Sequence, residues 1–455
     1  MPASFMTLFP VPKKQLEHYR NLLEWSAVSA ETASICLGNT ISPVSFSQKN
    51  TRQGSHREII SDLVKDISGF CRKLSQHPFQ RFTQNRQNEI EYLETFIKDH
   101  GLQSWSAPVS ESDILLDLPG MRLIDISVPG PHKVENYTVV FAPRAGHHSN
   151  IAERVALYLR DQGLTRMAIV EQKCADDIPM YIKGKRHYEN FDGQIKQYTD
   201  ILKYLKNLAG VPSHLIGVCQ PGPLLITALI LNPDLGKTFG SSGSPMDTEA
   251  QRSFLTDMSR LAGESYIDIL IHAFSRKVSR NKPGAGRLIY DGRLHALGFY
   301  LMAMDIHVSN FKHLFRDLKA KKRDNAERQK AFYKWFNTVN HFPAGFVRDT
   351  YKRIFVRNEL ARGQLKINGQ AVRYSDYPSN VPIWSIAGKG DSIAPPRQAN
   401  AHLDQVSVPE ELKLNEICNG GHMALFRSQS VLEKNYRRIA EFILKHSDLS
   451  KGDQT

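Results

Sequence analysis

The chain has 455 residues, 41% of them hydrophobic, and a formal net charge of +13. This length can bury a large core in one large domain or in two domains. Five scattered cysteines, an odd number, do not make a disulfide framework, which favours a reducing compartment. The N-terminus lacks the basic start and apolar core of a secretory signal, and no apolar run is long enough to cross a bilayer. We therefore expect a cytoplasmic protein.

The positive charge attracts anionic surfaces in general and does not by itself define a partner. Basic residues are spread along the chain, with short runs at 276–282 and 319–323. Neither run is interleaved with aromatic residues or carries a nucleic-acid motif, so solvated surfaces explain both better than a nucleic-acid groove. We expect no nucleic-acid partner.

Residues 1–105 are predicted to form a helical extension, with a first helix near 14–25 and a short one near 92–99. The strongest pattern lies at 57–74, where apolar residues recur at helical spacing and charged residues fall mostly elsewhere. Docking on the main domain is the ordinary role of such a helix. The alternative role is adsorption to an apolar particle or a membrane surface.

From about residue 106, short apolar runs alternate with helical patterns, which predicts βα units and a mostly parallel sheet. The expected fold class is α/β, with residues 106–247 and 351–455 forming the sheet and residues 248–350 forming a helical covering insertion. The last helix is expected at 425–444. The expected strands are 114–116, 121–124, 137–142, 167–170, 215–218, 237–240, 381–387 and 412–418, and the main expected helices begin near 151, 198 and 224.

Cys219 falls on the corner between a predicted strand and a predicted helix. A strand-to-helix corner holds a nucleophile above the sheet, and small neighbours such as Gly217 let the helix approach. Pro221 stands where glycine is more usual, but it leaves the N–H of Gln220 free to donate in an oxyanion hole. The alternative reading is a buried structural cysteine. At this corner we favour the nucleophile.

Two further candidates follow later strands: Asp391 after the strand ending at Ala387, and His422 after the last strand. In open α/β sheets, functional groups collect at the carboxyl ends of the strands. A histidine within reach of Cys219 makes the thiolate accessible, and a carboxylate orients the imidazole. Asp247 is the rival acid, with helix capping as its ordinary role. We favour Asp391.

The turn after the strand at 137–142 contains Arg144, Ala145, His147 and His148. We expect the backbone of this turn to supply the second oxyanion donor, while the His147 side chain has an equally plausible role in fixing the loop. Cys418 and His422 have no second ligand pair at suitable spacing, so we expect no structural zinc site and no metal ligand.

These motifs resemble the intracellular poly(3-hydroxybutyrate) depolymerases, which are related to polyhydroxyalkanoate synthases within the α/β-hydrolase fold. The resemblance covers most of residues 110–445. Val218-Cys219-Gln220-Pro221 is similar to the family's nucleophile motif, and Asp391 and Gly421-His422 match its acid and base. Further similar segments are 141–147, 298–299, 305, 314–315, 332–333, 342–344, 350–351 and 354–355.

The resemblance implies an enzyme that hydrolyses polyester bonds through Cys219, Asp391 and His422, without a cofactor, at a storage granule in the cytoplasm. The oxyanion donors would be Gln220 and the loop of Arg144, Ala145 and His147. Residues 390–395 look nearer the synthase form, so an acyltransferase is one alternative. The others are an inactive granule-surface binding protein and a hydrolase of small esters. The sequence leaves the oligomeric state open.

Overall fold

The computed structural model describes residues 104–144 and 151–450. The helices expected at 14–25, 57–74 and 92–99 lie outside the described residues. The chain divides into two compact units. One holds Leu102–Gly292 and Val339–Thr455, and the described part of the other is Arg293–Thr338.

An eight-stranded sheet forms the centre of the first unit, in the order β1-β2-β4-β3-β7-β8-β14-β15. β2 pairs antiparallel with both β1 and β4, and every other pair in this sheet is parallel. The mostly parallel sheet of an α/β-hydrolase fold is thus confirmed. The strands are β1 (Ile114–Asp117), β2 (Met121–Asp125), β3 (Thr138–Phe141), β4 (Met167–Gln172), β7 (Ser213–Val218), β8 (Gly236–Ser242), β14 (Ile383–Gly388) and β15 (Lys413–Cys418).

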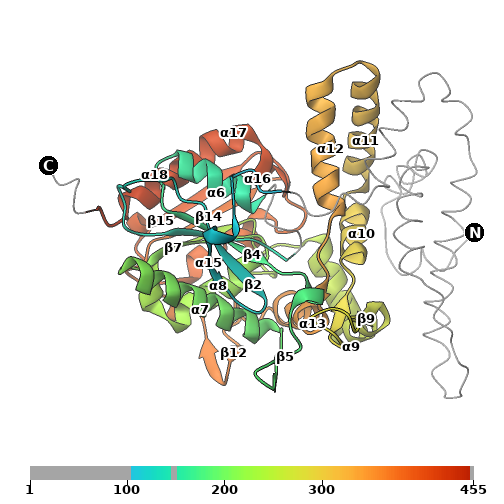
Figure 1. Ribbon diagram of the computed structural model, residues 1–455, viewed down its shortest axis with the longest axis horizontal. Helices are drawn as coiled ribbons and strands as arrows, with labels where there is room; N and C mark the ends of the chain where they lie inside the picture. The colour runs from blue at the N-terminus through green and yellow to red at the C-terminus, as the bar shows by residue number, and fades with distance from the viewer. Residues whose placement is uncertain (1–103, 145–150, 451–455) are drawn as a thin grey trace, which may run out of the picture. The chain divides into compact units, whose positions relative to one another are not determined.

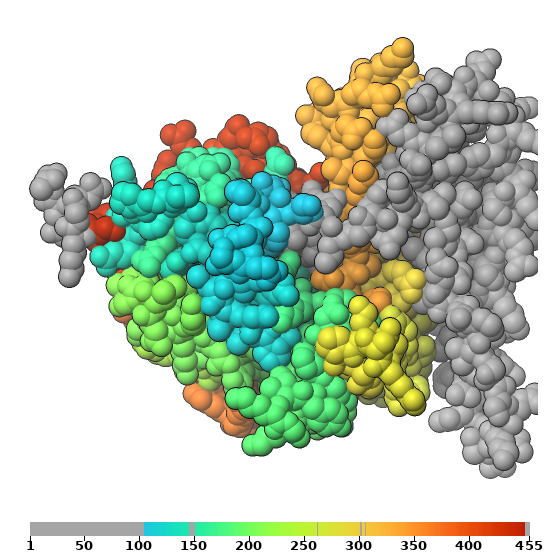
Figure 2. All heavy atoms as spheres, in the orientation of Figure 1, coloured from blue at the N-terminus to red at the C-terminus, as the bar shows by residue number. Residues whose placement is uncertain are grey.

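The central strands are buried on both faces, which explains why they read as continuous apolar runs rather than as alternating patterns. All residues of β3, β7 and β14 are buried. The edge strand β1 is only partly buried, and the first described segment, drawn in blue, lies at the surface in the space-filling view (Figure 2).

Helices cover both faces of the sheet (Figure 1). α7 begins at Phe191, seven residues before the expected start at Tyr198, because the side chain of Asn190 accepts a hydrogen bond from the Gly193 N–H at 2.9 Å and caps the helix. α6 and α16–α18 lie on one face, and α7 and α8 on the other. Their bounds are α6 (Ala152–Asp161), α7 (Phe191–Ala209), α8 (Pro221–Leu231), α14 (Pro396–Asn400), α15 (His402–Gln405), α16 (Ala424–Arg427), α17 (Gln429–Val431) and α18 (Arg437–Lys445).

The single helix expected at 425–444 is interrupted. Ser428 has an extended backbone (ψ 121°) between α16 and α17, so the chain leaves helical geometry there. A π-helical turn, Leu432–Tyr436, then precedes α18. Helical periodicity alone did not reveal these breaks.

The segment between β8 and β14 is helical, as expected, but it also contains short strands. α9 (Phe254–Phe274) leads into a three-stranded sheet of β9 (Ser275–Lys277), β10 (Leu288–Tyr290) and β11 (Phe342–Pro343). α13 (Ala344–Thr350) and a π-helical turn, Tyr351–Val356, return the chain to the main sheet. Two hairpins complete the first unit: β5 (Tyr181–Ile182) with β6 (Lys185–Arg186), and β12 (Leu365–Ile367) with β13 (Gln370–Val372). Single 3₁₀ turns lie at Glu111–Asp113, Ala175–Asp177, Pro233–Leu235, Tyr374–Asp376 and Glu410–Leu412.

The described part of the second unit is built from α10 (Gly292–Met302), α11 (Met304–Lys319) and α12 (Arg323–Asn337). Its helices pack through aromatic rings: Tyr333 contacts Phe311 with ring centroids 4.7 Å apart and donates or accepts a hydrogen bond with His307 Nδ1 at 3.0 Å. Among the described helices of the chain, none combines the length and apolarity needed to span a membrane.

Candidate active site

Cys219 lies at the turn between β7 and α8 with a left-handed backbone conformation (φ 63°). A non-glycine residue in this region is uncommon, and strained corners of this kind occur where a side chain must be presented to a site. The turn is held to the neighbouring strand β8, because the Cys219 N–H donates to the Ser242 carbonyl at 2.8 Å. The corner predicted for Cys219 is therefore the corner that the fold contains.

Two glycines allow the close approach of strand and helix at this corner. A Cβ on Gly217 would lie 2.9 Å from the backbone nitrogen of Gly222, and a Cβ on Gly222 would lie 2.4 Å from the Ser244 side chain. Only residues without a side chain fit at these two positions. Gly217 has the role that the sequence suggested.

Asp391 and His422 meet at the carboxyl end of the sheet. His422 Nδ1 lies 2.7 Å from Asp391 Oδ2, and both side chains are almost fully buried. Asp391 follows β14 and His422 follows β15, and these strands are parallel neighbours. The other carboxylate oxygen, Oδ1, accepts the N–H groups of Ile393 at 2.8 Å and Ala394 at 3.0 Å, which fixes the orientation of the carboxylate.

Three influences act on the pKa of His422. Burial alone lowers this pKa, but the charges of Asp391 and Cys219, and hydrogen bonds with both side chains, raise it well above the ordinary histidine value. His422 thus interacts with the Cys219 sulfur as well as with the Asp391 carboxylate. The three residues, which are far apart in the chain, meet at one edge of the sheet.

Gly243 provides the space next to the His422 ring. Its φ is +56°, and a Cβ there would lie 3.2 Å from Cε1 of His422 and 2.8 Å from Cδ1 of Leu425. The Gly243 N–H donates to the Ile386 carbonyl of β14 at 2.9 Å, which holds this backbone in place. A side chain at position 243 would therefore crowd the His422 imidazole, and glycine leaves room for it.

Asp247, the rival acid, has other partners. Its carboxylate accepts hydrogen bonds from Asn358 Nδ2 at 2.8 Å, Gln405 Nε2 at 3.0 Å and the Glu249 N–H at 3.0 Å. The last bond caps a turn, because the next helix, α9, begins only at Phe254 with Ser253 as its N-cap. Asp247 therefore ties three segments together, and the helix-capping role expected for it does not occur.

Gln220 connects the nucleophile corner to the end of β3. Its side-chain Oε1 accepts a hydrogen bond from the Arg144 N–H at 3.1 Å. The Arg144 N–H, expected as an oxyanion donor, is thus already paired with Gln220. Among the described residues, the Gln220 N–H has no such acceptor. Ala145 and His147 lie outside the described residues, as does the rest of their loop.

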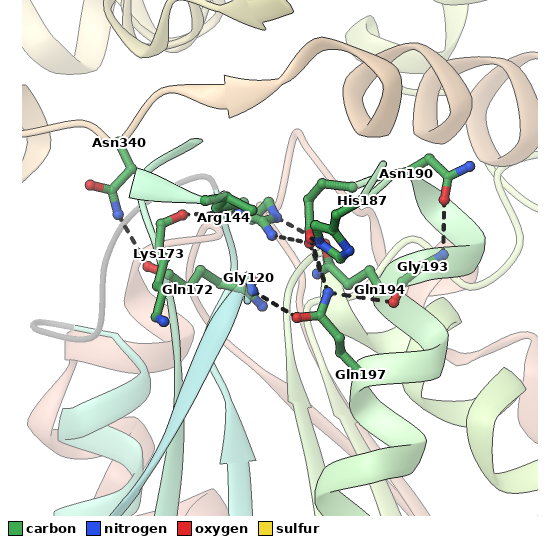
Figure 3. A network of polar contacts seen from close by, with 12 residues as sticks. Gly120, Arg144, Gln172, Lys173, His187, Asn190, Gly193, Gln194, Gln197 and Asn340 are labelled. Atoms are coloured by element: carbon green, nitrogen blue, oxygen red, sulfur yellow. Dashed lines mark hydrogen bonds and ion pairs between the residues drawn. The ribbon is translucent and has the colours of Figure 1, made fainter. Parts of the chain in front are cut away.

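The Arg144 side chain is buried in a polar network (Figure 3). Its guanidinium donates to Gln194 Oε1 at 2.8 Å, to the Lys173 carbonyl at 3.1 Å and to Glu189 Oε1 at 2.7 Å. Glu189 also accepts hydrogen bonds from Gln197, at 3.0 Å to each oxygen, and lies 2.8 Å from His187 Nε2. Burial raises the pKa of Glu189, but His187 and Arg144 outweigh it, so the pKa is lowered and the carboxylate stays ionised. This network fixes the position of Arg144, and with it the backbone that follows β3.

One known protein family matches part of the chain. Residues 243–447 match the family described as "PHB de-polymerase C-terminus". The matched region starts at Gly243 and includes both Asp391 and His422. This part of the chain is therefore similar to the C-terminal region of PHB depolymerases, which supports a hydrolase. None of the curated proteins matches the chain.

The solved structures that are similar to this chain are distant in sequence. A monoacylglycerol lipase from Paleococcus ferrophilus is 15% identical, with 72% of this chain and 99% of that chain covered and a TM-score of 0.39. An α/β hydrolase fold protein from Nakamurella multipartita is 16% identical, with coverages of 71% and 94% and a TM-score of 0.37. A monoglyceride lipase from Saccharomyces cerevisiae is 9% identical, with coverages of 76% and 99% and a TM-score of 0.48.

The other described cysteines of the chain are poor nucleophiles. Burial raises the pKa of Cys174 to about 11 and also raises the pKa of Cys418, so both thiols stay protonated near neutral pH. Neither lies at a strained corner. Among the described cysteines, Cys219 is the one at a left-handed strand-to-helix corner, and its charge acts on a histidine that is paired with a buried carboxylate.

Two residues of the site were missed from the sequence. Gly243 could have been noticed as a glycine directly after β8, next to the strand that carries the nucleophile. Glu189 had no local signal, because its pairing with Arg144 joins residues 45 positions apart.

Proposed function

We propose that this enzyme hydrolyses the ester bonds of poly(3-hydroxybutyrate) or a closely related polyhydroxyalkanoate through a thioester at Cys219. The observation that carries the proposal is the interaction of His422 with both Cys219 and Asp391 at the strained corner after β7. The family match supports a polyester substrate.

In the first step, the Cys219 sulfur attacks the ester carbonyl carbon. The proton lost by the thiol resides on His422, and the imidazolium is stabilised by the Asp391 carboxylate. The tetrahedral intermediate then collapses, the carbon–oxygen bond of the ester breaks, and His422 gives its proton to the departing hydroxyl end of the polymer. A 3-hydroxyacyl thioester on Cys219 remains.

In the second step, His422 takes a proton from water, and the hydroxide attacks the thioester carbonyl. The carbon–sulfur bond breaks, the sulfur recovers the proton from His422, and a free 3-hydroxy acid end leaves. These two reaction steps need no metal and no organic cofactor.

The negative oxygen of each intermediate needs hydrogen-bond donors. We assign the Gln220 N–H as one donor, because it follows the nucleophile and has no other acceptor among the described residues. The second donor is assigned to the backbone of the loop that contains Ala145 and His147. Arg144 acts here through its N–H bond to Gln220 rather than by direct contact with the oxyanion.

The proposed place of action is the surface of a polymer granule in the cytoplasm. The apolar face expected at 57–74 is the proposed adsorption surface. Removal of this segment should lower binding to polymer particles without abolishing cleavage of short, dissolved oligomers.

The test is incubation of the full chain with 3-hydroxybutyrate oligomers, followed by product analysis and mass spectrometry of the protein. We expect shorter oligomers and an acyl adduct on Cys219. Cys219→Ala should reduce the rate at least about 10³-fold. Cys418→Ala, at a buried cysteine, is the matched control and should retain activity. Activity that survives Cys219→Ala would reject the mechanism.

A synthase-type acyltransferase is the alternative. It differs in the acceptor, a polymer hydroxyl in place of water. Incubation with 3-hydroxybutyryl-CoA separates the two: release of CoA with polymer growth identifies transfer, and release of free 3-hydroxybutyrate identifies hydrolysis. An inactive binding protein would adsorb to granules and give neither product, and Cys219→Ala or His422→Gln would leave adsorption unchanged.

A further inference from the structure

A second group of three chemically different side chains lies outside the candidate active site, at Cys174, Asp176 and His341. One ligating atom from each residue lies within 4.8 Å of the other two. Cys174 Sγ is 3.4 Å from Asp176 Oδ2, and His341 Nδ1 is 2.5 Å from the same oxygen. A thiol, a carboxylate and an imidazole thus converge on one point.

The three residues come from two separate segments of the sheet-containing unit. Cys174 and Asp176 belong to the turn after β4, and His341 directly precedes β11. The backbone holds these segments together independently of the side chains, because the Ala175 N–H donates to the His341 carbonyl at 3.0 Å. The His341 N–H in turn points at Cys174 Sγ, at 3.4 Å. The backbone that carries the three side chains is therefore held in place before any ion binds.

The far side of the His341 ring faces another carboxylate. His341 Nε2 lies 3.7 Å from Oδ1 of Asp291, which is 2% exposed. In many metal sites, a carboxylate on the second ring nitrogen fixes the tautomer and the ring orientation of a ligating histidine. Without an ion, the Nδ1–H of His341 donates to Asp176, so an ion that binds there replaces this proton, while Asp291 lies on the far side of the ring, where it can orient the imidazole.

The backbone on the other side of the turn is also tightly packed. The Gly284 N–H donates to the Asp176 carbonyl at 2.8 Å, and a Cβ on Gly284 would lie 2.7 Å from the Ala175 carbonyl oxygen. This packing limits the movement of the turn that carries Cys174 and Asp176. Small adjustments of the side chains remain possible.

We propose that Cys174, Asp176 and His341 bind a divalent transition-metal ion, with Zn²⁺ as the ion that fits best. Zinc takes sulfur, imidazole nitrogen and carboxylate oxygen in a tetrahedral arrangement, and water would complete the set. Zinc binding displaces the proton of the Cys174 thiol into solvent, and the resulting thiolate and the Asp176 carboxylate balance the two positive charges. The side chains of Asp176 and His341 are 14% and 20% exposed, so an ion can enter from solvent.

Binding requires two local changes. Zinc–ligand distances of about 2.0–2.3 Å place ligand atoms about 3.3 Å or more apart, so Asp176 Oδ2 and His341 Nδ1 must separate by somewhat less than 1 Å. Arg276, whose Nη2 is 3.1 Å from His341 Nδ1, must also turn away. Its side chain is 45% exposed and can move into solvent or toward Asp176 Oδ1, now 3.9 Å away.

An ion at this position would join the turn after β4 to the chain that leads into β11 and α13. It would stabilise the base of the segment inserted between β8 and β14 without contacting Cys219 or His422. The ion therefore has a structural role, and the proposal is independent of the substrate that the enzyme cleaves.

The experiment uses the full chain, treated with a chelator, dialysed and then titrated with Zn²⁺. Bound zinc is measured after desalting, and Co²⁺ replaces zinc in a second series to detect thiolate ligation by its charge-transfer absorption. We expect one ion per chain and a rise in melting temperature on binding. Cys174→Ser and His341→Ala should weaken binding at least about tenfold and abolish the cobalt–thiolate band.

Two controls keep the outcome interpretable. Cys219→Ser removes the thiol of the candidate active site, and Cys418→Ser removes a buried thiol; both variants should bind zinc as the unmodified chain does. Circular dichroism without metal verifies that each variant is folded. If the unmodified chain retains no zinc, or if Cys174→Ser binds as tightly as the unmodified chain, the proposal is wrong. Absence of zinc binding would not argue against the thioester mechanism, and absence of hydrolysis would not argue against the zinc site.

Discussion

The Arg144 N–H donates a hydrogen bond to Oε1 of Gln220 over 3.1 Å, and this bond links the end of β3 to the residue that follows the candidate nucleophile. Gln220 therefore has two different tasks in the proposed mechanism. Its backbone N–H faces the developing oxyanion, and its side chain fixes the position of that backbone. Arg144 transmits the rigidity of its buried network to the corner through this bond.

Gln220→Ala should lower kcat by about tenfold or more, because a buried donor on Arg144 loses its acceptor and the corner loses an anchor. KM should change little, because the side chain does not face the substrate in the proposed mechanism. Gln220→Glu keeps an acceptor at the same position and should recover part of the loss. Steady-state kinetics on soluble oligomers measures kcat and KM of both variants. Equal losses in both variants would contradict an anchoring role.

Arg144→Met should destabilise the fold by about 3–5 kcal/mol, because it leaves the buried Glu189 carboxylate without its charged partner. Glu189→Gln should also destabilise the fold, because it leaves the buried Arg144 guanidinium without its carboxylate partner. The double variant should cost less than the sum of the two single changes, because no unpaired charge remains. Denaturant unfolding of the four proteins gives the coupling free energy. Strict additivity would contradict a direct interaction.

Gly243→Ala should reduce activity more than it reduces stability. The new Cβ would lie 3.2 Å from His422 Cε1 and displace the ring from Cys219. Part of the cost is backbone strain, of order 1 kcal/mol, because φ is +56°. Gly369→Ala is the matched control: its φ is +83°, but no atom lies within 4 Å of the new Cβ. Gly369→Ala should lose only the stability that backbone strain costs and keep its activity, whereas Gly243→Ala should lose somewhat more stability and most of its activity.

Asp391→Asn should change how stability depends on pH. Burial lowers the pKa of His422, but Asp391 and Cys219 raise it well above 6.5 in the folded chain. A raised folded-state pKa contributes stability that is fully present below the unfolded value and is lost as pH rises through the folded value. The unmodified chain should therefore lose more stability than Asp391→Asn on going from about pH 6 to alkaline pH. Denaturant unfolding at several pH values tests this, with His422→Gln as the control that lacks the titrating group.

Much of the fold was accessible from the sequence, because buried parallel strands and amphipathic helices have local patterns. The strands β3, β7 and β14 coincide with apolar runs, and the corner at Cys219 lies between two such patterns. The order of nucleophile, acid and histidine also pointed to one edge of the sheet, since parallel strands end on the same side. The breaks near Ser428 had no such signal, because helical periodicity continues across them.

The amino-acid sequence by itself determined the mostly parallel sheet and the sharp strand-to-helix corner at Cys219. Only the tertiary structure decided which side chains touch: that Arg144 pairs with Glu189, that Gly243 makes room for His422, and that Cys174 and Asp176 meet His341. The physical reason is the separation along the chain over which each kind of interaction acts. Hydrophobic periodicity acts over a few residues, whereas these contacts join positions that packing of the whole sheet brings together.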